Sequence, residues 1–124
     1  TLLDLSGLPP MNDQHLDGMS LVPLLNGDSS IERDAIYWHY PHYSNQGGFP
    51  GGAIRTGDWK LIERYEDGAV QLFNLADEIG EINVLATAES ARVTSMRSQL
   101  HAWYEEVDAK FLRAKPNGPK PWQP

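Results

Sequence analysis

The clearest periodic pattern in the chain lies between Glu89 and Phe111, where apolar side chains recur every three or four positions. That spacing places them along one stripe of an α-helix. Thr87 is a suitable N-cap, and Glu89 in the first turn suits the positive end of the helix dipole. The pattern predicts one long amphipathic helix, with a stripe made of Val93, Met96, Leu100, Trp103, Val107 and Phe111.

A second pattern, between residues 35 and 75, consists of short β-branched and aromatic runs separated by turn residues. Such runs are typical of strands. Gly57-Asp58 and Asp67-Gly68 separate the later runs, and Asp-Gly supplies the positive φ angles of a tight hairpin turn. We expect three or four antiparallel strands, within residues 35–40, 52–56, 59–65 and 69–75.

Both faces of this sheet carry apolar side chains. Strand side chains alternate, so Trp59 and Leu61 point to one face and Lys60 and Ile62 to the other. A sheet that is apolar on both faces needs two covers, whereas the sequence offers one long helix. The predicted fold class is α+β: a small antiparallel sheet of about four strands packed against one long C-terminal amphipathic helix. Helix residues opposite the stripe are expected to be solvated; they include Arg92, Arg97 and Glu105.

The two ends of the chain differ from this central part. "TLLDLSG" indicates the last turns of a helix that ends at Gly7, before Pro9 and Pro10. "SLVPLL" from Ser20 is a connector that could form a single helical turn. The proline-rich end is expected to run extended over the surface or to remain disordered. We therefore expect the end of a truncated helix and a connector in 1–30, the α+β subdomain in 31–112 and a tail in 113–124.

Composition excludes several classes of function. Seventeen acidic against ten basic residues give a net charge of −7, unlike the basic surface that binds nucleic acid or an anionic membrane. The absence of cysteine excludes a disulfide, a thiolate metal site and a cysteine nucleophile in this chain. The sequence shows no apolar run of membrane-spanning length and no positively charged signal start at Thr1.

The densest group of chemically useful side chains is "WHYPHYSNQGG", from Trp38 to Gly48. His39 and His42, with Asp17 or His15, are the nearest approach to a metal-ligand set, but their spacing does not specify a metal. Hydrogen bonds at a strand end are the favoured explanation of the two histidines. The chain has no serine in a G-x-S-x-G context and no phosphate-binding glycine loop. We therefore expect no catalytic residue and no metal site in this chain.

The order of its segments nevertheless resembles the C-terminal portion of the type I sulfatases, the family of arylsulfatases and polysaccharide sulfatases. The resemblance is carried by "TLLDLSGLP", "HLDGMSLVPLLNG", "RDAIYWHYPHY" and "GGAIRTGDWKLIERYEDGAVQLFNLADEIGEINVLA", followed by the amphipathic helix. It extends from Thr1 to about Trp103. One departure is Val84, where these sequences often carry asparagine.

The resemblance implies a parent enzyme that hydrolyses sulfate esters, with sulfated carbohydrates as its expected substrates. Such enzymes use calcium and a formylglycine made from a C/S-x-P-S-R motif, all within a large N-terminal catalytic domain. These 124 residues contain no such motif. The resemblance thus implies no cofactor in this fragment, an inactive fragment, and the N-terminal domain as its partner. Family members that act on external glycans are exported, which implies a periplasmic or secreted protein.

In the resembling enzymes the segment after the first strand of this subdomain reaches the mouth of the cleft. We therefore expect a substrate-facing lip formed by His39, His42, Asn45 and Arg55. Such side chains hydrogen-bond sugar hydroxyls or meet a sulfate group. The alternative is that Trp38 and Tyr40 belong to the core and that a mobile glycine loop follows. Three further residues match the family pattern and are expected to be structural: Trp59, Asp77 and Glu81.

Two other classes of function are compatible with the sequence. A stand-alone carbohydrate-binding module would also display aromatic side chains on a small β-rich domain, and this chain has four tryptophans and five tyrosines. A self-associating module is the other alternative, since an exposed apolar sheet face favours association. Dependence of molecular size on concentration would separate these two.

Overall fold

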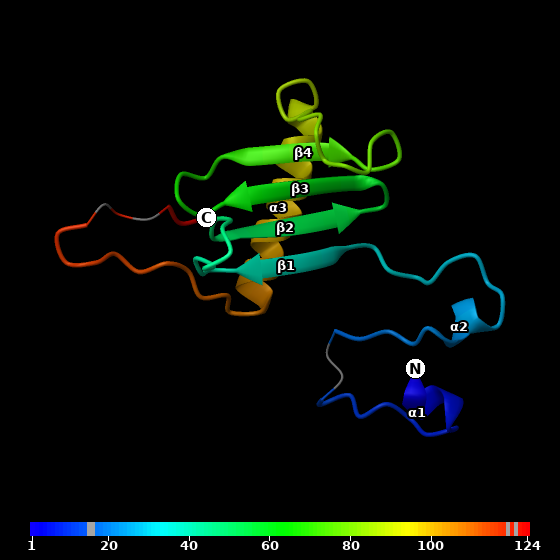
Figure 1. The fold of residues 1–124 in the computed structure, drawn as a ribbon. Helices are drawn as coiled ribbons and strands as arrows, with labels where there is room; N and C mark the ends of the chain where they lie inside the picture. Colours follow the sequence, from blue (N-terminus) through cyan, green and yellow to red (C-terminus); the bar gives the residue numbers. More distant parts are fainter. Residues whose placement is uncertain (15–16, 119, 121) are drawn as a thin grey trace. The chain divides into compact units, whose positions relative to one another are not determined.

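The computed structural model describes residues 1–14, 17–118, 120 and 122–124 (Figure 1). The chain forms two compact units, Thr1–Arg33 and Asp34–Pro124. Among the described residues, no helix is both long and apolar enough to cross a membrane. The division of the chain at residues 30 and 112 stays a prediction.

The first unit contains two single-turn helices, α1 (Leu2–Leu5) and α2 (Val22–Leu25). Both end in the same way, because Gly7 and Gly27 have positive φ and the following amide donates to a carbonyl five residues back. This is the Schellman arrangement, in which glycine adopts the left-handed conformation at little cost. The helix end at Gly7 and the helical turn in "SLVPLL" are therefore confirmed.

The second unit is built on a four-stranded antiparallel sheet of order β1-β2-β3-β4. Each strand pairs with the next along the chain, so the sheet is a simple meander. Gly57 and Gly68 provide the positive φ angles of the second and third turns. The strands are β1 (Ile36–Tyr40), β2 (Gly51–Thr56), β3 (Trp59–Arg64) and β4 (Val70–Asn74).

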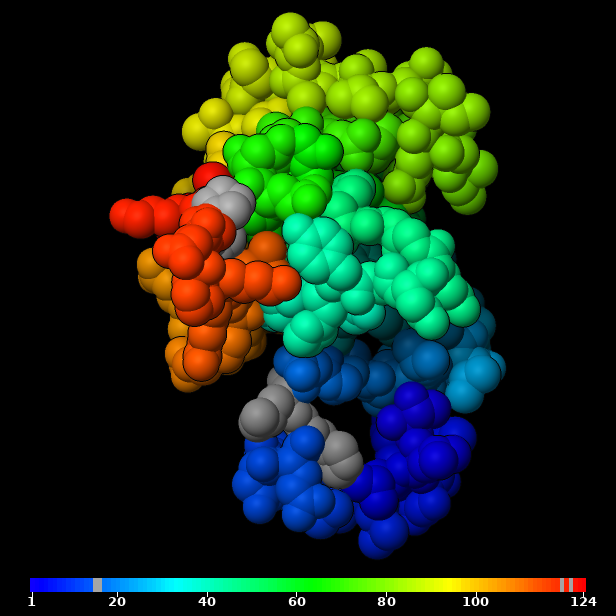
Figure 2. Space-filling view, turned by 60° about the vertical axis from the view of Figure 1, so that its left-hand side comes forward, coloured from blue at the N-terminus to red at the C-terminus, as the bar shows by residue number. Residues whose placement is uncertain are grey.

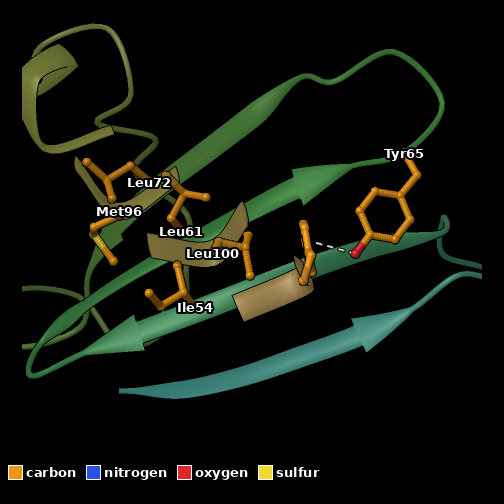
Figure 3. Close-up of a cluster of buried hydrophobic side chains, with 7 residues drawn as sticks. Ile54, Leu61, Tyr65, Leu72, Met96 and Leu100 are labelled. Atoms are coloured by element: carbon orange, nitrogen blue, oxygen red, sulfur yellow. Dashed lines mark hydrogen bonds between the residues drawn. The ribbon is translucent and has the colours of Figure 1, made fainter. Parts of the chain in front are cut away.

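One long helix, α3 (Ser90–Glu106), crosses one face of the sheet (Figure 1). The register places Tyr37, Ile54, Leu61 and Leu72 in one row across the strands. Helix side chains pack on this row, and the α+β fold class is confirmed. The buried cluster drawn in Figure 3 consists of Ile54, Leu61, Tyr65, Leu72, Met96, Leu100 and Tyr104.

The predicted start of the helix, about Glu89, agrees with the observed start at Ser90, whereas the predicted N-cap and the predicted end were wrong. Glu89, not Thr87, is the N-cap, and the helix ends at Glu106 instead of continuing to Phe111. Asp108 has a φ of 50°, and the amide of Ala109 donates to the carbonyl of Tyr104. This closes the helix with a third Schellman arrangement. The turn leaves Val107 exposed and returns Phe111 to the core, against Tyr104.

The opposite face of the sheet carries a second set of apolar side chains. Trp38 and Tyr40 are 46% and 52% exposed there, and Ile36 and Phe49 are also exposed. The predicted alternation along β3 is confirmed, because Leu61 is buried under α3 while Ile62 faces this second side. We call this surface the open face; it is lined by Ile36, Trp38, Tyr40, Phe49 and Ile62.

One end of the open face is covered by the segment that connects β4 to α3. Lys60 on the open face forms an ion pair of 2.6 Å with Glu81 of this segment. Asn74 donates a hydrogen bond of 2.6 Å to Asp77, which shapes the turn after β4. Phe73 is only 3% exposed as a result. Asp77 and Glu81 thus have the structural roles expected of them.

Candidate functional site

The loop between β1 and β2 holds most of the side chains singled out by the sequence. His42 is exposed and meets the Tyr40 ring edge-on, with 5.5 Å between ring centroids. The hydroxyl of Tyr43 donates a 3.0 Å hydrogen bond to Glu66 of the β3–β4 turn. Asn45 is exposed in the following turn. The loop therefore presents His42 and Asn45 to the outside while Tyr43 ties it to the neighbouring hairpin.

His39 lies on the other side of the strand, toward α3. Its Nε2 is 2.8 Å from the backbone oxygen of Lys110, and its Nδ1 is 2.7 Å from the hydroxyl of Tyr65. A carbonyl oxygen can only accept, so Nε2 carries the proton. In a neutral ring Nδ1 then accepts the proton of Tyr65. Both ring nitrogens are engaged with protein atoms, and the imidazole joins the sheet to the chain that follows α3.

The hydrogen-bonded group continues into the core through two tyrosines. The hydroxyls of Tyr65 and Tyr104 share a hydrogen bond of 2.8 Å, drawn as a dashed line in Figure 3. Burial raises the pKa of both phenols above the ordinary tyrosine value, and for Tyr104 the hydrogen bond with Tyr65 raises the pKa further. Gly52 lies directly beneath, since a Cβ there would overlap both hydroxyls. These phenols are therefore fixed hydrogen-bonding groups and remain protonated at neutral pH.

A charged group lies beside these tyrosines. The carboxylate of Glu63 is fully buried, and Arg97 and His101 of α3 approach it at 2.6 Å and 2.9 Å. A buried carboxylate requires such partners, because an unpaired charge in the interior is very costly. The expectation that Arg97 lies on a solvated face was therefore wrong. Its guanidinium reaches around the helix to the sheet and also lies 5.3 Å from the Trp122 ring.

Arg55 is separated from the rest of the predicted lip. In the register it pairs with Ile36 at the start of β1, whereas Gly51 pairs with Tyr40 at the loop end. Four residues of strand correspond to roughly 13 Å. The exposed Arg55 side chain donates to the backbone oxygen of Gly57, at 3.0 Å. The structure thus brings His42 and Asn45 together, turns His39 inward and places Arg55 at the far end of the sheet.

The metal-ligand set considered from the sequence has no counterpart in the described part of the chain. There, no group of three or more His, Cys, Asp or Glu side chains is placed to hold a metal ion. His39 is engaged by Tyr65 and Lys110, whereas His42 is exposed in the β1–β2 loop. His15, the fourth residue considered, lies outside the described residues.

Sequence reasoning missed the polar groups of the core. Tyr104 belongs to the buried face of α3, and His101 lies 2.9 Å from the buried carboxylate of Glu63, yet none of the three was singled out. One signal was present, since Glu63 follows Leu61 by two positions and therefore shares its buried face. A carboxylate at such a position indicates a cationic partner on the covering element. Arg97 on α3 fits that requirement, and His101, four residues further along the helix, lies within hydrogen-bonding distance of the same carboxylate.

Comparison with known proteins gives one family for almost the whole chain. The model of the C-terminal region of N-sulphoglucosamine sulphohydrolase matches residues 1–110. A protein from Formosa agariphila described as "Sulfatase" is 32% identical over 117 residues, which cover 83% of this chain and 21% of that protein.

Solved structures agree with this result. A protein in complex with its substrate D-glucosamine-2-N,6-O-disulfate is 26% identical, with a TM-score of 0.63 over 87% of this chain and 22% of its own. A protein in complex with κ-ι-κ-neocarrahexaose is also 26% identical, with a TM-score of 0.65 over 82% of this chain and 22% of its own. A 2-O GAG sulfatase, at 21% identity, shares the fold, with a TM-score of 0.72 over 88% and 24%. The chain spans between a fifth and a quarter of the length of each relative.

Proposed function

Because the chain belongs to the family of N-sulphoglucosamine sulphohydrolase C-terminal domains, we propose that it is the C-terminal subdomain of an enzyme that hydrolyses sulfate esters of carbohydrates. The observation that carries this proposal is the family match over residues 1–110. The fold supports it, because the four-stranded meander under one helix also occurs in a 2-O GAG sulfatase.

The residues present do not fit the groups that perform the chemistry in this family. The sequence contains no C/S-x-P-S-R motif for formylglycine, and the described residues include no carboxylate cluster for calcium. In our proposal both groups belong to an N-terminal catalytic domain, and the 124-residue chain has no sulfatase activity by itself. The role of the chain is to close one side of the substrate cleft.

Of the four residues of the predicted lip, we assign substrate contact to His42, Asn45 and Arg55 and a positioning role to His39. His42 and Asn45 are exposed in one loop and can donate to and accept from sugar hydroxyls. His39 positions that loop, because its two ring nitrogens hold Tyr65 and the Lys110 carbonyl. Arg55, at the far end of the strand, would reach another unit of an extended oligosaccharide. Sulfated carbohydrate is the proposed substrate class, and two relatives were solved with ligands of that kind.

The test compares two substrates of the enzyme formed by this chain and its catalytic domain. His42→Ala and Asn45→Ala should raise KM for a sulfated oligosaccharide, with about a tenfold loss of kcat/KM for each hydrogen-bonding side chain removed. An aryl sulfate has no sugar hydroxyls for these side chains to bind, so its hydrolysis should be unchanged. Sulfate release measured by ion chromatography serves for both substrates.

The matched control is Gln46→Ala, a neighbouring polar residue of the same loop whose side chain has no assigned role. An enzyme that releases no sulfate from either substrate would contradict the proposed activity. Equal losses on both substrates after His42→Ala would be compatible with the proposed activity but would contradict the substrate-binding role of the lip.

The open face suggests the partner in this proposal. Trp38 and Tyr40 keep about half of their surface exposed, although aromatic side chains usually gain stability from burial. We assign the catalytic domain as the partner that covers them. In its absence the 124-residue chain should self-associate through this face, and its sedimentation coefficient should rise with concentration. Trp38→Glu should abolish that rise, whereas a rise that persists in this variant would place the contact elsewhere.

A further inference from the structure

A groove of about 530 Å³ separates the β1–β2 loop from the segment that follows α3. His42 and Tyr43 line it from the loop, and Glu66 lines it from the β3–β4 turn. The opposite wall is basic, because it includes Arg113, Lys115 and Lys120 beside the uncharged Leu112 and Gly118. Figure 2 shows this last part of the chain, coloured orange, beside the turquoise surface of the loop.

The charge of this wall is unlike that of the rest of the molecule. The chain carries a net charge of −7, yet residues 109–124 contain Lys110, Arg113, Lys115 and Lys120 and no acidic residue. Lys110 pairs with Asp108. Within the described residues, Arg113, Lys115 and Lys120 form no ion pair. The groove therefore holds three positive charges that no described carboxylate pairs with.

The one carboxylate that lines the groove is already engaged. Glu66 accepts the hydroxyl proton of Tyr43 at 3.0 Å, and this hydrogen bond raises the pKa of Tyr43. Glu66 therefore fixes the loop wall in place, while the opposite wall supplies the cations. Three cations against one carboxylate leave the groove with an excess of positive charge, which attracts an anion.

The structure assigns this groove as an anion subsite that holds a sulfate group of the bound oligosaccharide. This inference rests on the proposed function and deepens it. The guanidinium of Arg113 can form paired hydrogen bonds with two sulfate oxygens, and Lys115 adds a point charge. His42 belongs to both the lip and the groove, so a saccharide held by the lip can continue directly into the groove.

Binding to the 124-residue chain tests this assignment without any turnover. The probes are κ-ι-κ-neocarrahexaose and the same hexasaccharide after chemical desulfation, titrated into ¹⁵N-labelled chain. The amide signals of Arg113, Lys115 and Gly118 should shift with the sulfated probe and not with the desulfated one. Lys115→Gln should weaken binding about fivefold, the size expected for one charge-assisted contact at a partly exposed site.

Two further variants separate the groove from general charge effects. Lys110→Gln removes the same charge from the same segment outside the groove lining and should leave affinity unchanged. Glu66→Gln removes the negative charge while its amide oxygen still accepts from Tyr43, so it should strengthen binding. Structural damage would not produce that increase. The ¹⁵N spectrum of each variant reports whether the fold is retained.

Several results would overturn the assignment: equal binding of the desulfated probe, equal weakening by Lys110→Gln and Lys115→Gln, or signal shifts confined to His42 and Asn45. The proposed enzyme activity is judged separately, by sulfate release. Sulfate release without binding of the probe in the groove would contradict the subsite assignment alone. Binding in the groove by a protein that releases no sulfate would support the subsite and contradict the proposed enzyme activity.

Discussion

The two faces of the sheet are built from the same strands and are both rich in apolar side chains, but they differ in how they are completed. On the face under α3, Leu61 packs with Leu100 in a cluster closed to solvent. On the open face, Trp38 and Tyr40 remain about half exposed. On the first face the carboxylate of Glu63 is fully buried in its ion pair with Arg97, whose side chain is 34% exposed. Both side chains of the Arg64–Asp67 pair on the second side are exposed. One face thus stabilises the unit, and the other is available for contacts.

The largest expected effect is a loss of stability, measured by truncating two neighbouring residues of β3 that lie on opposite faces of the sheet. Leu61→Ala creates a cavity in a fully buried site and should lower the free energy of unfolding by about 3 kcal/mol. Ile62→Ala removes a partly exposed side chain from the open face and should cost less than half as much. Urea denaturation followed by circular dichroism measures both. Equal losses would mean that the open face is as well packed as the covered one, which would break the comparison.

A smaller loss of stability is expected from breaking the ion pairs, and it should again differ between the two faces of the sheet. Arg97→Met leaves Glu63 buried with His101 alone and should cost about 2 kcal/mol, because removing one partner of a buried pair exposes the desolvation penalty of the other. Glu63→Gln in the Arg97→Met background should restore part of this loss. Arg64→Met, which breaks the exposed pair with Asp67, is the matched control and should have a much smaller effect. No difference between the two methionine variants would contradict the assigned roles.

The smallest effect should be seen at high pH. Tyr65 and Tyr104 have raised pKa values in the folded chain because of burial, so folding favours their protonated forms. Their stabilisation is complete below the ordinary tyrosine pKa of 10.0 and decreases as the pH rises above it. Linkage limits the decrease to roughly 1.4 kcal/mol per pH unit for each hydroxyl.

Thermal unfolding between pH 9 and pH 10, where the two hydroxyls together lose about 1 kcal/mol at most, provides the measurement for this third effect. Tyr104→Phe should reduce the slope. An unchanged slope in this variant would place the alkaline sensitivity outside the covered face.

The fold was largely predictable because its determinants are local. Alternation along β3, the Asp67-Gly68 turn and the spacing of Met96 and Leu100 each follow from neighbouring residues. The end of α3 was not predictable from periodicity. Val107 and Phe111 continue the pattern, but Asp108 takes a left-handed conformation and redirects the chain so that Phe111 packs on Tyr104.

The candidate site was less predictable, because it depends on contacts between distant residues. Periodicity cannot show that Arg97 turns toward Glu63, thirty-four residues away. Nor can it show that the carbonyl of Lys110 accepts a hydrogen bond from one ring nitrogen of His39. The basic wall of the groove was hidden for the same reason. Its cations lie in a proline-rich tail that has no regular pattern, and only the fold brings Lys115 near His42.

Gly52 limits how this sequence can change over evolutionary time. Any side chain at that position would occupy the space of the Tyr65 and Tyr104 hydroxyls, so a mutation there can be accepted only after one of the tyrosines has been replaced. The residues acceptable at these three positions therefore depend on one another, although the positions are far apart in the sequence. Among diverging relatives, we expect residues 52, 65 and 104 to change together or not at all.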